Sequence, residues 1–206
     1  DTDFDSIRAD PSRDPERVDR AYDAPVGAMS FNWNSINIFV RPGKGGEVPF
    51  VYLDPLPDYF KVDNRAKTAG KAGADLEISR GGAGVSVRGT IGPAHDEIVA
   101  YKNVDDPIDW SGRNLVYFLS QRGISVGGVV KAGRKSESAK QLAKADSKPL
   151  SMAVADMLKF SNNYVAEMLT KSLAAQNGTL PATLGAGMQN IRDYLVKDVG
   201  LDAKRF

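Results

Sequence analysis

The sequence has no cysteine and only one histidine, His95, among its 206 residues. Without thiols there can be no disulfide framework, cysteine nucleophile or thiolate zinc site. A single imidazole leaves almost no room for a Ser-His-Asp triad or a histidine metal cluster. No apolar run is long enough to cross a bilayer, and no signal-peptide pattern is recognised. We therefore expect no metal or other cofactor, no transmembrane segment, and a mature protein or a piece of one.

Strong charge of either sign is also missing. Lys and Arg number 27 and Asp and Glu 26, which gives a net charge of +1. No basic stripe and no acidic tail stand out, so nucleic acid is not an expected partner. The length is enough to bury a substantial core in one large domain or two small ones.

The first half of the chain has the alternation typical of strands. From Ala28 onward, apolar side chains alternate in two sets that are one position out of phase. The sets are Phe31 with Trp33, and Ile36 with Ile38 and Val40. A bulge or turn near Asn34-Ser35 would account for the shift.

Further extended runs follow in the same region. They lie at residues 48–56, at 76–78 and 85–87 on either side of a Gly-rich hairpin at Arg80–Gly84, and at 97–104. Residues 28–104 are therefore predicted to form a small β-rich unit.

The second half changes to helical periodicity. A helix is predicted over 110–121 with Gly123 as its C-terminal cap, then a short strand over 124–130 and a polar connection over 131–148. The remaining chain is predicted to form three helices, over 149–159, 163–176 and 184–199.

The triplet Ser161-Asn162-Asn163 lies in the turn between the first two of these helices. Apolar residues recur at helical spacing on both sides of it. They are Leu150, Val154, Met157 and Leu158 before the triplet, and Tyr164, Val165, Met168, Leu169 and Leu173 after it. Such a turn would present the Ser161 hydroxyl and the Asn163 amide side by side, a pair suited to passing a proton and holding a peptide. Taken alone, the same residues also suit ordinary helix capping.

Two stretches resemble a known family. Asp23–Asn32 reads DAPVGAMSFN and is followed by IFVRPG at Ile38–Gly43, and Lys159–Lys171 carries the Ser-x-Asn turn. In this order and spacing they resemble the class C low-molecular-mass penicillin-binding proteins, which are periplasmic D-alanyl-D-alanine carboxypeptidase/endopeptidases. The resemblance covers nearly the whole chain. It implies an α+β multidomain fold with β-rich inserted domains and a helical part of a penicillin-binding, β-lactamase-like transpeptidase domain.

The resemblance also implies domain boundaries. A first inserted domain would comprise residues 1–27 and 104–146, with a β-rich second inserted domain, 28–103, nested in it. The helical portion of the transpeptidase domain, with Ser-x-Asn, would be residues 147–206.

In such enzymes three motifs build a serine acyl-transfer site. A Ser-x-x-Lys helix supplies the nucleophile, Ser-x-Asn relays a proton and binds the substrate backbone, and Lys-Thr-Gly binds the terminal carboxylate. Carried onto this chain, the resemblance makes Ser161 the relay hydroxyl and Asn163 the substrate-holding amide.

The other two motifs are not found in these 206 residues. No lysine has a serine three positions before it, and Lys67-Thr68-Ala69-Gly70 is only a near match that precedes Ser161. We therefore interpret the chain as an internal piece of such an enzyme that alone cannot form an acyl-enzyme. Whether it is an expressed piece, a proteolytic fragment or a degenerate protein stays open.

Tyr22 and Asp19 are further candidates, for substrate binding. The resemblance places them where the first inserted domain borders the catalytic cleft, so they could contact the stem peptide, and a carboxylate would suit the free amine of a diaminopimelate residue. The alternative is a half-buried tyrosine and a solvated charge.

Phe31 and Trp33 are interpreted as packing within the β unit, with a sugar-stacking platform for glycan strands as the alternative.

Together these observations predict part of a cell-wall hydrolase. The parent would be a serine-type D-Ala-D-Ala carboxypeptidase or endopeptidase that cleaves peptidoglycan stem peptides in the periplasm, soluble or peripherally membrane-associated, and is inhibited by β-lactams. A second chain completing the catalytic domain is a possible partner. The alternative is a non-catalytic scaffold that binds peptidoglycan or a partner enzyme.

Overall fold

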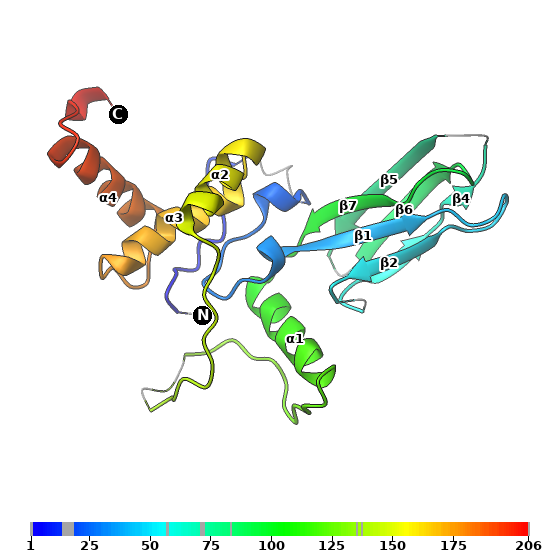
Figure 1. Cartoon of the computed structure of the whole chain (residues 1–206), viewed down its shortest axis with the longest axis horizontal. Coiled ribbons are helices and arrows are strands. Elements are labelled where there is room, and N and C mark those ends of the chain that lie inside the picture. Colours follow the sequence, from blue (N-terminus) through cyan, green and yellow to red (C-terminus); the bar gives the residue numbers. More distant parts are fainter. Residues whose placement is uncertain are drawn as a thin grey trace.

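The structure is a computed structural model that describes residues 2–13, 19–56, 58–70, 73–82, 84–134, 136 and 138–205. Figure 1 shows the strands on one side of the molecule and helices α2, α3 and α4 on the other, with α1 beside the strands. The expected mixed α and β class is confirmed by this arrangement. No helix in the described ranges is both long and apolar enough to cross a membrane.

A three-stranded antiparallel sheet forms the part of the β unit nearest the helices. Its central strand is β1 (Ser35–Arg41), which pairs with β2 (Phe50–Asp54) on one edge and β7 (Ile98–Asn103) on the other. The runs predicted at 48–56 and 97–104 form β2 and β7, which are two residues and one residue shorter at each end, and the alternation of Ile36, Ile38 and Val40 falls within β1.

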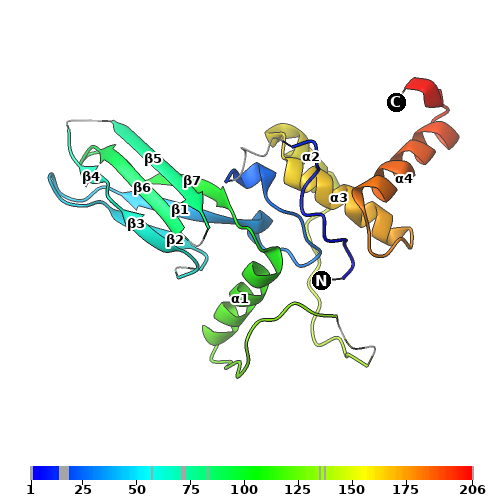
Figure 2. The same ribbon diagram turned by 180° about the vertical axis from the view of Figure 1, so that it is seen from behind.

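A four-stranded sheet lies against the first, and it is seen in front in Figure 2. Strand β6 (Gly84–Ile91) pairs antiparallel with β5 (Ala74–Gly81) and parallel with β3 (Lys61–Asn64) and β4 (Lys67–Thr68). The predicted hairpin is confirmed because Gly81 pairs with Gly84. Ala83, at its tip, lies outside the described residues.

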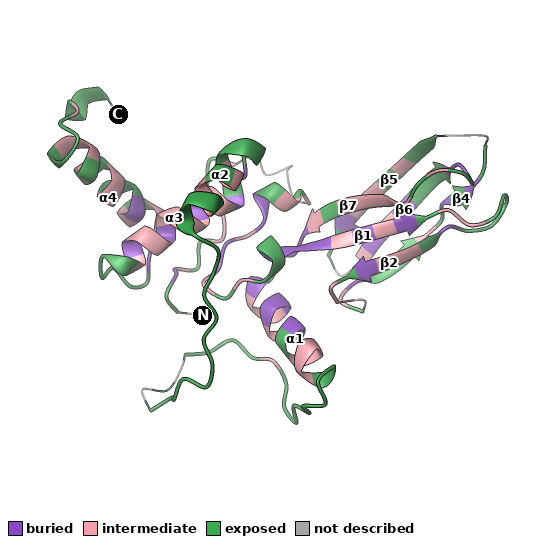
Figure 3. Cartoon of the chain, in the orientation of Figure 1, coloured by how far each residue is buried: buried purple, intermediate pink, exposed green. Residues whose placement is uncertain are grey.

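The main core fills the space between the two sheets and α1. Alternate residues of β1 are buried in it, as the period-2 geometry of a strand requires, and Figure 3 marks buried segments on β1 and α1 in purple. Its fully buried members include Ile36, Ile38, Val40, Val85, Val87, Ile91, Val104 and Trp110.

Helix α1 (Pro107–Ser120) begins three residues before the predicted start. Asp106 caps it by accepting hydrogen bonds from the amides of Ile108 (2.9 Å) and Asp109 (3.1 Å), and proline suits the first helical position. Gly123 follows in the left-handed conformation (φ 75°), which confirms its role at the helix end.

The predicted strand over 124–130 is wrong. These residues are irregular, and residues 124–129 are exposed. Gly127 and Gly128 leave the run without side chains at its centre, and Val130 packs onto α1 at Gly112 instead of onto a strand. The connection that follows is irregular where it is described, at 131–134, 136 and 138–148.

The predicted strand over Phe31 and Trp33 is also wrong. Asn32–Asn34 form a short 3₁₀ turn, η2, in which all three residues have positive φ. The strand starts only at Ser35, so a tight turn, and not a bulge, separates the two alternating sets.

Three helices make up the other side of the molecule: α2 (Leu150–Phe160), α3 (Asn163–Gln176) and α4 (Leu184–Lys197). Helix α3 is the central one, since both α2 and α4 contact it. Its Lys171 is fully buried and donates to the Asp5 carboxylate and the Ile7 carbonyl. These two hydrogen bonds attach the N-terminal segment to α3.

Candidate functional site

The turn between α2 and α3 is shaped by its middle residue. Asn162 is 5% exposed and caps α3, because its side-chain oxygen accepts a hydrogen bond from the Val165 amide at 3.0 Å. Ser161 ends α2 in the left-handed conformation (φ 48°, ψ 47°). Capping is thus done by Asn162, and both Ser161 and Asn163 are exposed.

The two outer side chains differ in what they contact. Within the described part of the chain, the Ser161 hydroxyl makes no hydrogen bond. Asn163 donates from Nδ2 to Oδ1 of Asp23 at 2.7 Å. Because a carboxylate can only accept in this pair, the bond fixes which end of the Asn163 amide is nitrogen. The Asn163 oxygen and its second N–H remain available to a ligand.

Asp23 is a residue of this site that the sequence alone does not single out. It is 5% exposed and ends the short 3₁₀ helix η1 (Ala21–Asp23). Its Oδ2 is buried and has no hydrogen-bond partner among the described residues. Nothing in the sequence places Asp23 beside Asn163, which lies 140 positions later.

Arg13 holds Asp23 and the first turns of α3 together. It donates to the Asp23 carbonyl at 2.7 Å and forms an ion pair with Glu167. Burial raises the pKa of the Glu167 carboxyl, and the neighbouring Arg13 guanidinium opposes that rise. Both side chains are largely buried, so the start of α3 is anchored to this segment at two points.

Tyr164 supplies a third attachment. Its hydroxyl lies 2.7 Å from the Ser30 hydroxyl, and burial raises the pKa of the phenol. Ser30 in turn accepts from Asn34 Nδ2 at 2.8 Å. The segment DAPVGAMSFN thus packs directly on α3, the helix that begins at Asn163.

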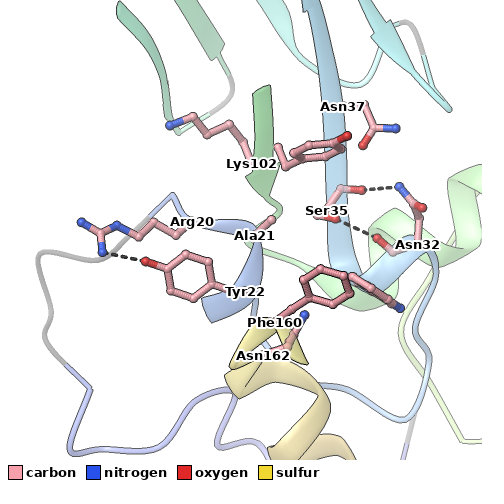
Figure 4. A pocket seen from close by; sticks show the side chains of 11 residues that line it. Arg20, Ala21, Tyr22, Asn32, Ser35, Asn37, Lys102, Phe160 and Asn162 are labelled. Carbon is pink, nitrogen blue, oxygen red and sulfur yellow. Dashed lines mark hydrogen bonds between the residues drawn. The ribbon is translucent and has the colours of Figure 1, made fainter. Parts of the chain in front are cut away.

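A hollow of about 650 Å³ lies next to the turn, and Figure 4 shows the side chains around it. It is lined by Arg20, Ala21, Tyr22, Asn32, Trp33, Ser35, Asn37, Tyr101, Lys102, Phe160 and Asn162. The structure therefore brings Tyr22 and the Ser-x-Asn turn to one hollow, through Asn162. Ser161 and Asn163 do not line it.

The two predicted substrate-binding residues have different surroundings. Tyr22 is 38% exposed and accepts a hydrogen bond from Arg20 at 2.7 Å. Asp19 forms an ion pair with Lys102 at 2.6 Å and does not line the hollow. The Tyr22 side chain thus forms part of the wall of the hollow, and the Asp19 carboxylate is already engaged by a cation.

The near match to Lys-Thr-Gly lies far from this turn in the fold. Lys67 and Thr68 form strand β4, at the end of the β unit away from the helices in Figure 1. Thr68 is fully buried and accepts a hydrogen bond from the Gly43 amide at 3.0 Å. Its hydroxyl is therefore structural. In the described ranges, no three His, Asp or Glu side chains are grouped so that they could hold a metal ion.

Comparison with known proteins gives a consistent result. The model of the D-Ala-D-Ala carboxypeptidase 3 (S13) family matches residues 1–206. A D-alanyl-D-alanine carboxypeptidase from Actinomadura sp. (strain R39) is 31% identical over 214 residues, which cover 98% of this chain and 39% of that protein. The chain thus spans about two fifths of the length of this relative.

Two solved structures share the fold. Penicillin binding protein 4 from Haemophilus influenzae matches with a TM-score of 0.71 and 20% identity, over 95% of this chain and 44% of that one. The same protein complexed with a β-lactam matches with a TM-score of 0.60 and 21% identity, over 84% and 41% of the two chains.

Proposed function

Because the chain belongs to the D-Ala-D-Ala carboxypeptidase 3 (S13) family, we propose that it forms part of a serine-type D-Ala-D-Ala carboxypeptidase or endopeptidase. The substrates would be peptidoglycan stem peptides, and β-lactams would acylate the same site. The nucleophile and the carboxylate-binding motif would come from outside these 206 residues. Such an enzyme would act in the extracytoplasmic space.

The observation that carries this proposal is the geometry of the turn at Ser161–Asn163. Capping by Asn162 leaves the outer two side chains exposed, and Asp23 orients one of them. A free hydroxyl next to an oriented amide is what proton relay and substrate holding require. Such groups act in catalysis because they are fixed before the substrate arrives.

Each side chain then has a role in the proposed reaction. The nucleophile attacks the D-alanyl carbonyl, and the Ser161 hydroxyl passes a proton toward the leaving amine. The Asn163 amide hydrogen-bonds the substrate backbone and aligns the scissile bond. Tyr22 contacts the stem peptide at the hollow. Asp19 contributes to substrate binding indirectly, because its ion pair holds Lys102, which lines the hollow.

The domain boundaries follow the same proposal. Residues 1–27 with 104–146, and the nested unit 28–103, would be inserted domains, and residues 147–206 would belong to the transpeptidase domain. The packing of Asp23 on α3 supports a close association between the first inserted domain and the helices. The contact between Ser30 and Tyr164 supports one between the start of the nested unit and α3.

Acylation by a fluorescent penicillin tests the proposal, in a protein that joins this chain to the flanking parts of its catalytic domain. Ser161→Ala and Asn163→Ala should each slow acylation by ~10²-fold or more. The matched control is Ser151→Ala, because Ser151 is an exposed serine of the adjacent α2. Unchanged labelling in both site variants would refute the roles, and the absence of any labelling would favour the scaffold alternative.

A further inference from the structure

The turn at Asn32–Asn34 is strained. Asn32, Trp33 and Asn34 all have left-handed backbones, with φ of 49°, 55° and 48°. Asparagine tolerates this conformation, but it is rare for a bulky side chain. Strain of this kind persists only where the surroundings impose it, and it gathers at functional sites.

Asn34 and its neighbours impose the conformation. Asn34 is fully buried, and its Nδ2 donates to the Pro25 carbonyl and the Ser30 hydroxyl, both at 2.8 Å. Its Oδ1 accepts from the Phe31 amide at 3.2 Å. Trp110 donates its indole N–H to the Phe31 carbonyl at 2.8 Å. None of these bonds uses the side chain of Trp33.

What the turn achieves is to hold a large aromatic ring at the surface. The Trp33 side chain is 44% exposed and lines the 650 Å³ hollow, which we call the Trp33 hollow. Tyr22, Tyr101 and Phe160 add three more exposed aromatic rings to its wall. Phe31, the other aromatic residue of the segment, packs on Phe118 and does not line the hollow.

The polar groups of the hollow are mostly uncharged or already neutralised. The Asn37 amide and the Tyr101 hydroxyl lie opposite each other on β1 and β7, and neither makes a hydrogen bond within the described chain. Of the two cations that line it, Arg20 donates to the Tyr22 hydroxyl and Lys102 is paired with Asp19. A third cation, Lys148, lies over the Trp33 ring with its Nζ 5.8 Å from the ring centroid, and it is paired with Asp156.

Aromatic walls with free amide and hydroxyl groups match the chemistry of a pyranose ring. The C–H face of a sugar stacks on an aromatic ring, and its hydroxyl and acetamido groups need uncharged hydrogen-bond partners. The volume of the hollow lies in the range of small-molecule sites, about 300–1,000 Å³. The carboxylates of the stem peptide would instead be expected to meet unpaired cations, so the peptide would touch this hollow only at Tyr22.

We propose that the Trp33 hollow binds an N-acetylated amino sugar of the glycan strand to which the stem peptide is attached. This inference rests on the proposed function, because it takes the occupant to be the neighbouring part of the same substrate. The hollow reaches the candidate catalytic turn at Asn162, and Asn37 lies at its opposite end in Figure 4. A glycan held by Trp33 would therefore lie beside the turn that acts on its peptide.

The test is a ligand-observed NMR titration of this chain with the β-1,4-linked tetrasaccharide of N-acetylglucosamine, which carries no peptide. We expect saturable binding, weakened at least tenfold by Trp33→Gly and several-fold by Asn37→Ala. The matched control is Phe50→Ala, since Phe50 is 62% exposed on β2 and lies outside the hollow. Its affinity for the tetrasaccharide should equal that of the unmodified chain.

Thermal unfolding of the same variant separates binding from structure. Glycine adopts positive φ without strain. The Trp33→Gly variant should therefore have an unchanged or higher melting temperature although its affinity for the tetrasaccharide falls. A tryptophan that serves only to stabilise the turn would give a lower melting temperature, and that result would overturn the inference.

A parallel titration with the free stem pentapeptide separates this inference from the proposed function. If the peptide binds through Trp33 and the tetrasaccharide does not, the sugar site is wrong and the proposed function stands. If the tetrasaccharide binds through Trp33 while Ser161→Ala and Asn163→Ala leave acylation unchanged, the sugar site stands and the catalytic roles are wrong.

Discussion

Asp23 and Asn163 form the most consequential single contact of the candidate site. A carboxylate acceptor gives a charge-assisted hydrogen bond that is stronger than a neutral one. Asn163 is the first residue of α3, where the helix dipole also favours a nearby anion. The same carboxylate can therefore stabilise the helix start and fix the plane of the Asn163 amide.

Removing the Asp23 carboxylate should slow acylation without abolishing it. We expect Asp23→Ala to lower the penicillin acylation rate about tenfold, less than the loss of the Asn163 amide itself, because an unrestrained amide samples unproductive orientations. Asp23→Asn should largely rescue the rate, since its side-chain oxygen can still accept from Asn163 Nδ2. The measurement is the second-order acylation rate constant.

A double-mutant cycle distinguishes this positioning role from general destabilisation. If Asp23 acts through Asn163, adding Asp23→Ala to Asn163→Ala should slow acylation no further. Fully additive losses, or a rate for Asp23→Ala equal to that of the unmodified enzyme, would show that Asp23 does not orient the amide.

Among the secondary-structure elements, the contact between α3 and α4 depends on one glycine. A Cβ on Gly187 of α4 would lie 2.1 Å from the Thr170 carbonyl oxygen of α3, far inside contact distance. The backbone of one helix therefore touches the other at this point. Gly185, two residues earlier in α4, has only the Thr183 hydroxyl nearby, at 3.9 Å.

Alanine substitutions at these two glycines should change the stability of the chain in opposite directions. Gly187→Ala should destabilise the chain by about 1–3 kcal/mol or more, because the helices must separate. Gly185→Ala should stabilise it by up to ~1 kcal/mol through helix propensity. Chemical denaturation monitored by circular dichroism measures both. Equal effects of the two substitutions would contradict the close approach at Gly187.

The sequence predicts the elements well where one periodicity dominates. The α3 bounds are as predicted, and Ile36, Ile38 and Val40 are fully buried on β1 as their alternation indicates. The pattern misleads at Phe31 and Trp33, because left-handed Asn residues and the buried hydrogen bonds of Asn34 override the alternation. These bonds join distant segments, and no local pattern reveals them.

In the molecule as a whole, the candidate site is assembled from segments that are far apart in the chain. The spacing of Ser161 and Asn163 identifies the turn, and Asn162 could have been recognised as the cap from its residue type. The Asp23 contact and the hollow depend on the packing of residues 20–37 against α2 and α3. That packing is a tertiary property, so the partners of the turn emerge only from the structure.

Helix α2 has an apolar face that the rest of the described molecule does not cover. It has no buried residue, and Leu150, Leu158 and Phe160 are each more than half exposed. Behind it, an apolar groove of about 410 Å³ runs between α2, α3 and α4. Its lining includes Leu150, Val154, Met157, Leu169, Leu173 and Ile191. Contiguous exposed apolar surface of this kind promotes association.

We therefore expect the isolated chain to self-associate with increasing concentration and to bind an apolar dye such as ANS. Leu150→Lys combined with Leu158→Lys should reduce both effects, because two charges on this face oppose contact between copies. The matched control places lysine at Val48 and Phe50, which are 61% and 62% exposed on the β unit. Sedimentation velocity measures the association. A chain that remains monomeric at all concentrations, or equal effects of the two double variants, would show that the α2 face does not drive association.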